Sequence, residues 1–149
     1  MALIVICVSA LCIAIFVAVR VKRVRERREL EQYSIGPDTL HDLITAKDKV
    51  RVFDVRVPLD LLAYSEIIPG ATRIPPKEIM ENPSLIPKEE DAVVYCTCPD
   101  DKASREILRR ARSLNFCRLK ILRGGLAAWK AKGYPVEPYE KAFRLDTGV

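Results

Sequence analysis

Short apolar runs of β-forming residues alternate with helical patterns along most of this chain, and this alternation limits the folds open to it. Val50–Val55 is a β-rich run, Ala92–Tyr95 is a continuous apolar run, and Leu119–Leu122 is a third strand candidate. A continuous apolar run is typical of a strand that is buried on both faces of a parallel sheet. Strands that alternate with helices predict an α/β domain around a mostly parallel sheet.

Helix signals separate these strand candidates. Residues 36–38 read Gly-Pro-Asp, which places Pro at the first helical position and Asp in the first turn. Ser104–Leu114 repeats apolar residues on one helical face, namely Ile107, Leu108, Ala111 and Leu114. Gly124-Gly125 begins a further helix, which carries Trp129. Between Pro58 and Pro99 lie seven of the ten prolines, which predicts loops around a brief strand at Ala71–Ile74.

The first part of the chain has a different character. Leu3–Val19 is an uncharged run interrupted only by Ser9, and as a helix it is about 26 Å long. Met-Ala precedes the run and the basic residues follow it, which favours a transmembrane anchor over a cleaved signal peptide. The positive charge that follows the run predicts a single-pass membrane protein with residue 20 onward in the cytoplasm.

Length and charge set further bounds. A chain of 149 residues supports one compact domain and excludes a multidomain enzyme. The predicted division is a transmembrane anchor at 1–20, a basic juxtamembrane helix or linker at 21–33, a domain at 34–138 and a tail at 139–149. The whole net charge of +5 lies in residues 20–28, so the domain itself is neutral. We therefore expect a membrane contact through residues 3–19 and no nucleic-acid partner.

The five cysteines follow no disulfide framework, which favours a reducing compartment. Cys96, Cys98 and Cys117 lack zinc-ligand spacing with His41, the single histidine, so no metal site is predicted. Cys117 precedes a strand candidate and is expected in the core. His41 lies on the first helix of the domain and is expected at the surface.

Cys96 is the candidate nucleophile. It directly follows the Ala92–Tyr95 strand and precedes the Ser104–Leu114 helix. Ligands of open α/β sheets bind beyond the carboxyl ends of the strands, and the partial positive charge of a helix N-terminus favours a thiolate and binds anions. A cysteine in this position serves two chemistries, which are sulfur transfer through a persulfide and phosphate or arsenate chemistry through a thiol adduct.

The residues after Cys96 argue against phosphate chemistry. Phosphoryl transfer requires an Arg clamp, typically six positions after the Cys, where this chain has Lys102. Asp100 and Asp101 would also repel a dianion. A Cys–His hydrolase lacks support, since His41 lies on a different helix.

Four segments in this order resemble the rhodanese family of sulfurtransferases. They are Val52–Arg56, Ile68–Ala71 with Ile74-Pro75, Val93–Cys96, and Gly124–Trp129 with Gly133–Val136. The resemblance covers about Ile35 to Pro138 and implies a rhodanese-like five-stranded parallel sheet flanked by helices, here preceded by one transmembrane helix. It implies that Cys96 accepts a sulfane sulfur from a donor such as thiosulfate or polysulfide. The resulting persulfide passes the sulfur to a thiol or cyanide, and no cofactor is required.

The loop after Cys96 departs from the common family pattern. Pro99 stands where the family has Gly, and Asp101 stands near the place of a basic residue. Cys-Thr-Cys-Pro followed by an acidic pair resembles a variant among bacterial rhodanese domains of membrane proteins. The residues expected to bind substrate are those of the loop and the helix start, namely Thr97, Cys98, Asp101, Lys102, Ala103 and Ser104.

Several roles stay open at this point. Asp54 and Arg56 either brace the loop, as the resemblance implies, or are an ordinary turn Asp and surface Arg. Cys98 takes sulfur from Cys96, forms a disulfide with it, or fills space. The alternatives to a sulfurtransferase are a Cys-x-Cys redox protein and a non-enzymatic module that docks a membrane partner. A protein thiol is a further candidate acceptor beside small sulfur compounds.

Overall fold

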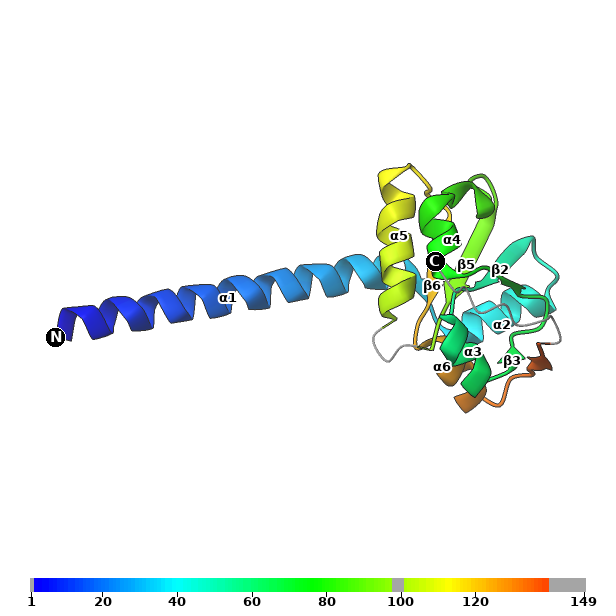
Figure 1. Ribbon diagram of the computed structural model, residues 1–149, viewed down its shortest axis with the longest axis horizontal. Helices are drawn as coiled ribbons and strands as arrows, with labels where there is room; N and C mark the ends of the chain where they lie inside the picture. Colours follow the sequence, from blue (N-terminus) through cyan, green and yellow to red (C-terminus); the bar gives the residue numbers. More distant parts are fainter. Residues whose placement is uncertain (1, 98–100, 140–149) are drawn as a thin grey trace, which may run out of the picture. The chain divides into compact units, whose positions relative to one another are not determined.

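The computed structural model describes residues 2–97 and 101–139, without the side chains of residues 2–10, 26, 27, 29 and 30 (Figure 1). The chain divides into two compact units, Met1–Tyr33 and Ser34–Val149. Cys98, Pro99 and Asp100, as well as residues 140–149 of the predicted tail, lie outside the described residues.

The first unit contains a single element, the helix α1 (Ala2–Gln32). Among the side chains that the structure describes, no helix is long and apolar enough to cross a membrane. The transmembrane anchor and the membrane localisation predicted from the sequence are therefore not supported. The reason is that the described apolar part of α1 runs only from residue 11 to residue 19 before Arg20, while residues 3–10 of the predicted span lie outside the described side chains.

The second unit contains a five-stranded sheet in which all neighbouring strands are parallel. The strands, in spatial order, are β1 (Ser34–Ile35), β6 (Leu119–Leu122), β5 (Asp91–Tyr95), β2 (Val50–Asp54) and β4 (Thr72–Arg73). The predicted α/β fold with a five-stranded parallel sheet is thus confirmed. Because β5 is the middle strand, its carboxyl end lies at the centre of one sheet edge.

Helices cover the sheet (Figure 1). They are α2 (Pro37–Thr45), α3 (Pro58–Ala63), α4 (Pro76–Glu81), the 3₁₀ helix η1 (Pro83–Leu85), α5 (Lys102–Ser113) and α6 (Gly125–Ala131). Leu40 of α2 and Trp129 of α6 pack with Val52, Val93 and Tyr95 of the sheet in one buried cluster. α4 and α5 contact each other, and α5 packs on β6. A separate antiparallel pair joins β3 (Glu66–Ile67) to β7 (Glu137–Pro138).

The Pro-rich middle of the chain is more helical than its composition suggests. α3, α4 and η1 each begin with a proline, namely Pro58, Pro76 and Pro83. The first helical position has no hydrogen-bond partner for its N–H, so proline fits there without loss. The prediction of loops in this region was therefore wrong at three places, because prolines that begin helices were interpreted as breakers.

Two side chains predicted in the core lie at the surface. Cys117 is exposed, and its Sγ lies 3.7 Å from the carbonyl oxygen of Asn115. Leu114, predicted on the buried face of its helix, is 37% exposed, because α5 ends at Ser113 and the chain turns away. The left-handed backbone of Asn115, with φ 61°, makes that turn.

α2 and the segment after α6 are joined by polar and aromatic contacts. The Tyr134 hydroxyl and the Lys132 ammonium donate hydrogen bonds to the Asp38 carboxylate, at 2.6 and 2.9 Å. The His41 ring stacks on the Tyr134 ring with centroids 4.1 Å apart, so His41 is half-buried rather than fully at the surface. These contacts lower the pKa of Asp38, mainly through the hydrogen bond from Lys132 and then that from Tyr134.

Replacement of Asp38 by Asn should therefore reduce stability in a pH-dependent way. The lowered pKa means that the ionised carboxylate stabilises the folded state above the ordinary value of 3.8, and that this contribution is lost as the pH falls through the folded pKa. Denaturant unfolding of wild type and Asp38→Asn should show a difference at neutral pH that shrinks in acid. The control is Glu81→Gln, which changes an exposed carboxylate of α4. A difference that is constant with pH would contradict the assignment.

Candidate active site

Cys96 directly follows β5, and its side chain is fully buried. The backbone of Cys96 packs closely against the first residues of α6. The carbonyl oxygen of Cys96 accepts a hydrogen bond from the N–H of Leu126 at 3.2 Å. A Cβ atom on Gly125 would lie 1.9 Å from the same oxygen, and Gly125 has a φ of +54°. Only glycine fits there, so the Gly-Gly pair of the sequence allows α6 to approach the cysteine.

Asp101, at the other end of the loop that follows Cys96, also contacts the start of α6. Asp101 precedes α5 and has a left-handed backbone with φ 51° and ψ 29°, a conformation that Asp tolerates better than most residues. Its carboxylate accepts a hydrogen bond from the Gly124 N–H at 3.1 Å. Both ends of the segment from Cys96 to Asp101 are therefore bonded to the backbone at Gly124–Leu126. The acidic residue that departs from the common loop pattern has a structural partner here.

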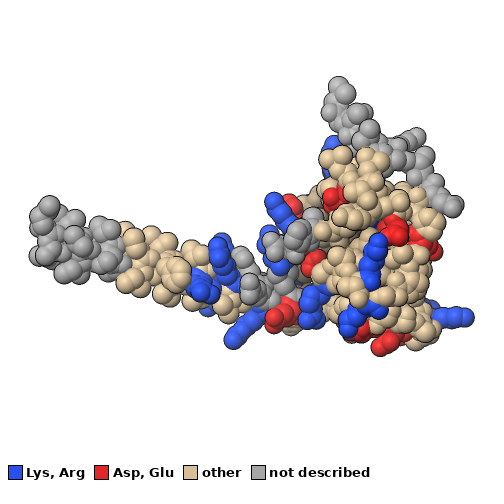
Figure 2. Space-filling view, turned by 90° about the horizontal axis from the view of Figure 1, so that it is seen from below, with Lys and Arg blue, Asp and Glu red and all other residues tan. Residues whose placement is uncertain are grey.

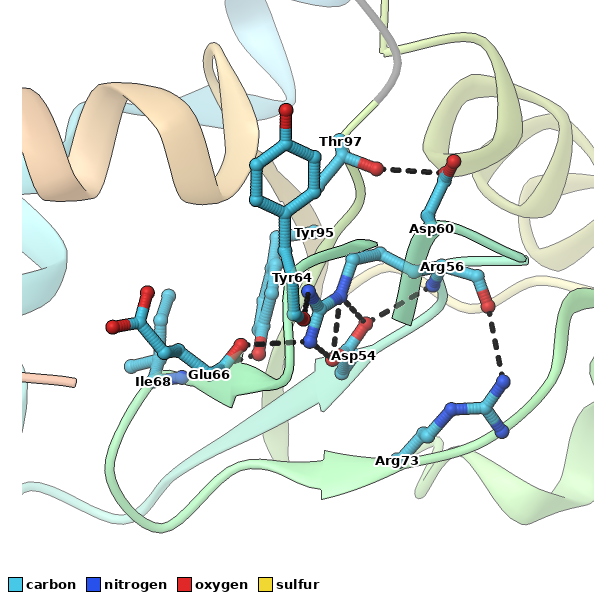
Figure 3. Close-up of polar contacts among 9 residues, drawn as sticks. All are labelled: Asp54, Arg56, Asp60, Tyr64, Glu66, Ile68, Arg73, Tyr95 and Thr97. Carbon is cyan, nitrogen blue, oxygen red and sulfur yellow. Dashed lines mark hydrogen bonds and ion pairs between the residues drawn. The ribbon is translucent and has the colours of Figure 1, made fainter. Parts of the chain in front are cut away.

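Helix α3 borders the loop from another direction. The Thr97 hydroxyl donates a 2.7 Å hydrogen bond to the carboxylate of Asp60, which lies in the first turn of α3 (Figure 3). Asp60 was not among the candidates from the sequence. It was missed because α3 itself was not predicted, although Pro58 followed by an acid two residues later is a typical helix start.

Asp54, the last residue of β2, and Arg56 form a fully buried ion pair (Figure 3). The Arg56 Nε donates to both carboxylate oxygens of Asp54 at 2.9 and 2.8 Å, and the Arg56 backbone N–H donates to Oδ1 at 3.0 Å. The guanidinium also donates to the carbonyl oxygens of Tyr64 and Glu66, at 2.7 and 2.9 Å. Arg56 is therefore not a surface residue. The pair holds the segment that follows α3.

Tyr95, the last residue of β5, is buried and contacts the chain after β3. Its hydroxyl oxygen accepts a hydrogen bond from the Ile68 N–H at 3.2 Å. Burial raises the pKa of Tyr95 well above its ordinary value, and the negative charge of Asp54 raises it further. The phenol is therefore neutral in the folded protein. Its hydroxyl holds the backbone at Ile68.

The remaining candidates lie at the start of α5. Lys102 is exposed, Ala103 is half-buried, and Ser104 is fully buried in the first turn. The Ser104 hydroxyl has no hydrogen-bond partner in the part of the chain that the structure describes. A buried hydroxyl without a partner is uncommon in folded proteins. The described residues contain no cluster of His, Cys, Asp and Glu that could hold a metal ion.

Comparisons with known proteins agree with this architecture. Residues 36–132 match the family described as Rhodanese-like domain. A protein named sulfurtransferase from Allochromatium vinosum is 28% identical over 102 residues, which are 68% of this chain and 92% of that protein.

Two solved structures are similar in fold. The full-length protein from Lactobacillus plantarum is 25% identical with a TM-score of 0.66, covering 80% of this chain and 98% of that one. The thiosulfate sulfurtransferase from Pseudomonas aeruginosa is 26% identical with a TM-score of 0.58. In that comparison 72% of this chain matches 20% of the longer one.

The Asp54–Arg56 pair predicts a large effect of substitution. Arg56→Met should lower the free energy of unfolding by about 3–5 kcal/mol, because it leaves the Asp54 carboxylate buried without its counter-charge. The matched control is Arg118→Met, which breaks an exposed pair with Asp91, and its loss should be far smaller. Urea unfolding measures both. Equal losses in the two variants would show that burial of the first pair carries no special cost.

The close contact at Gly125 predicts a second difference. Gly125→Ala should cost about 3 kcal/mol or more, from left-handed strain plus the clash with the Cys96 carbonyl. Gly133→Ala has the same kind of φ, +72°, but open space around its Cβ, and should cost only about 1 kcal/mol. Thermal or denaturant unfolding compares the two. Similar losses would mean that the Gly125 contact is relieved by a backbone shift.

Proposed function

Because this chain belongs to the rhodanese-like domain family, we propose that it is a sulfurtransferase that carries a sulfane sulfur on Cys96. The observation that carries the proposal is the position of Cys96. Its thiol follows the central strand of the sheet and precedes α5, the longest helix of the second unit. This is the edge at which parallel α/β sheets bind ligands, and a helix begins there.

The first step of the proposed reaction loads sulfur on the enzyme. The Cys96 thiolate attacks the outer sulfur of a donor such as thiosulfate, and a new bond forms between the two sulfur atoms. The donor's own sulfur–sulfur bond breaks, and its electron pair leaves with sulfite. The product is a Cys96 persulfide that carries one negative charge or one proton. No external oxidant or reductant is consumed.

Residues at the start of α5 are suited to stabilise the anions of this step. The N–H groups in the first turn of a helix point toward its N-terminal end, and they favour negative charge there. Ser104 supplies a buried hydroxyl in that turn, and Lys102 supplies a positive charge at its surface. We assign to these residues the binding of the donor and of the persulfide.

The surrounding contacts position the reacting thiol. The Gly124–Leu126 backbone holds the residues on both sides of the loop, and the Asp60 carboxylate holds Thr97. The Asp54–Arg56 pair is farther away in the hydrogen-bond network. It acts through α3 and the segment after it, so both residues are positioning residues rather than catalytic ones.

The second step returns the enzyme to its starting state. A thiolate or cyanide attacks the outer sulfur of the persulfide, the bond to the Cys96 Sγ breaks, and the electron pair returns to Cys96 as thiolate. The acceptor leaves as a persulfide or as thiocyanate. Sulfur therefore passes from donor to acceptor with no net change in the protein.

A mass measurement tests the proposal. The full-length chain is incubated with thiosulfate or with polysulfide and then analysed by intact mass and by peptide mapping. Wild type should gain one sulfur atom at Cys96 and should lose it on addition of cyanide. Cys96→Ser should gain none. Cys117→Ser, which changes an exposed cysteine far along the chain, should behave as wild type.

Two results would overturn the assignment. Addition of sulfur to Cys96→Ser at the wild-type level would place the persulfide on another cysteine. Failure of wild type to gain sulfur from either donor would remove the enzymatic function.

A further inference from the structure

The cations of the second unit differ in whether they have a partner. Lysines and arginines on several elements form ion pairs, namely Arg51 with Glu90, Arg118 with Asp91, Lys130 with Glu66 and Lys132 with Asp38. Figure 2 shows basic and acidic side chains interspersed on one face of this unit. Lys102, Arg105, Arg109 and Arg110 of α5 form no ion pair within the described part of the chain, and neither do scattered cations such as Lys49, Lys77 and Lys120. What distinguishes α5 is that its cations occur together on one helix, in which Glu106 is the only acid.

Three of these cations form a stripe. Lys102, Arg105 and Arg109 are separated by three and four residues, a spacing that puts them on one helical face. Glu106 lines a hollow together with these residues, so this face carries one acid beside its three cations. The buried residues of α5, Ile107, Leu108 and Ala111, lie on the opposite face. The stripe extends about 10 Å along the helix and begins at its first residue. It therefore leads away from the loop that follows Cys96.

Exposed apolar side chains lie in and beside α3, the helix that contacts the same loop. Val57, Leu59, Leu62 and Tyr64 are 41%, 70%, 60% and 54% exposed, and they occur within eight consecutive residues. We call these four residues the apolar rim. The hydrogen bond between Asp60 and Thr97 places α3 against the first residue after Cys96 (Figure 3). Single exposed apolar residues are common, but four within one short segment are typical of a segment that contacts another molecule.

The two surfaces together point to the kind of acceptor. We propose that the acceptor of the sulfur is a protein thiol on an acidic surface, an inference that rests on the sulfur transfer proposed above. The cationic stripe of α5 binds its acidic residues, and the apolar rim of α3 binds an apolar patch beside its cysteine. A small thiol or cyanide needs neither surface to react. A lipid surface would fit the charge but offers no thiol.

The step itself is the acceptor half of the reaction. The acceptor's cysteine thiolate attacks the outer sulfur of the Cys96 persulfide, and the bond between that sulfur and the Cys96 Sγ breaks. The electron pair stays on Cys96 as a thiolate, and the acceptor leaves with a persulfide. The cationic stripe would raise the rate at which an acidic acceptor associates with this protein. Added salt screens these charges and lowers that rate.

The test measures transfer from the full-length chain, loaded with polysulfide, to three acceptors. Two are synthetic peptides of equal length with one cysteine between leucines, flanked by glutamates in one peptide and by glutamines in the other. The third is 2-mercaptoethanol, an uncharged small thiol. The glutamate peptide should react faster than the glutamine peptide, and added salt should remove the difference.

Variants locate the effect on the structure. Arg105→Glu with Arg109→Glu should slow transfer to the glutamate peptide by about tenfold. Leu59→Ser with Leu62→Ser should slow transfer to both peptides. Neither pair should change the rate with 2-mercaptoethanol by more than about twofold, which also shows that the variants are folded. The control is the double variant Lys49→Glu with Lys120→Glu, which changes the net charge by the same amount. Both lysines line a hollow together with Asp91 and Arg118. This variant should leave the transfer rates to all three acceptors unchanged.

Each outcome decides the proposal. Equal rates for the two peptides, or an unchanged glutamate-peptide rate in the Arg105/Arg109 variant, would overturn it. Binding to phosphatidylglycerol vesicles that this variant loses, with peptide transfer unchanged, would assign the stripe to lipid and would also overturn it. A chain that forms the persulfide and reacts with 2-mercaptoethanol but shows no peptide preference refutes only this inference. A chain that never forms the persulfide refutes the sulfurtransferase as well.

Discussion

The buried contact between Asp54 and Arg56 is the constraint on which the surroundings of the site depend. A guanidinium enclosed by protein must have every donor satisfied, and here the donors go to one carboxylate and to two backbone carbonyls after α3. Those bonds fix where the chain leaves α3. The carboxylate of Asp60 in α3 accepts a hydrogen bond from Thr97, the residue after Cys96. The Asp54–Arg56 pair is therefore linked to the loop through α3. A strand end, a helix and the residue after Cys96 thus form one connected network.

A second constraint is the distance between β5 and α6. The carbonyl oxygen of Cys96 occupies the space that any side chain at position 125 would need. A helix start without a side chain can therefore lie directly against the end of the central strand. Its N–H groups donate to the carbonyl oxygen of Cys96 and to one oxygen of the Asp101 carboxylate. The glycine pair is a requirement of packing, and the acidic Asp101 belongs to the same arrangement.

Much of this arrangement could be predicted from the sequence. The apolar run at Ala92–Tyr95 indicated a buried parallel strand, and Leu119–Leu122 indicated a further strand. The position of Cys96 between a strand and a helix indicated the edge of the sheet. The helices at Pro58, Pro76 and Pro83 were missed because proline both breaks and begins helices, and local composition does not separate the two uses. Contacts between distant residues, such as Thr97 with Asp60 or Gly125 with Cys96, depend on tertiary packing, which no spacing in the sequence encodes.

The contrast between two cysteines has a consequence for oxidative damage. Cys96 is completely covered, whereas Cys117 lies at the surface beside a left-handed turn. Oxidation of cysteine by peroxide follows thiol accessibility as well as ionisation. Of these two thiols, Cys117 is the one that peroxide reaches without any movement of the protein. The movement that would admit a sulfur donor to Cys96 would also admit peroxide, so sulfur loading and oxidation of Cys96 would compete.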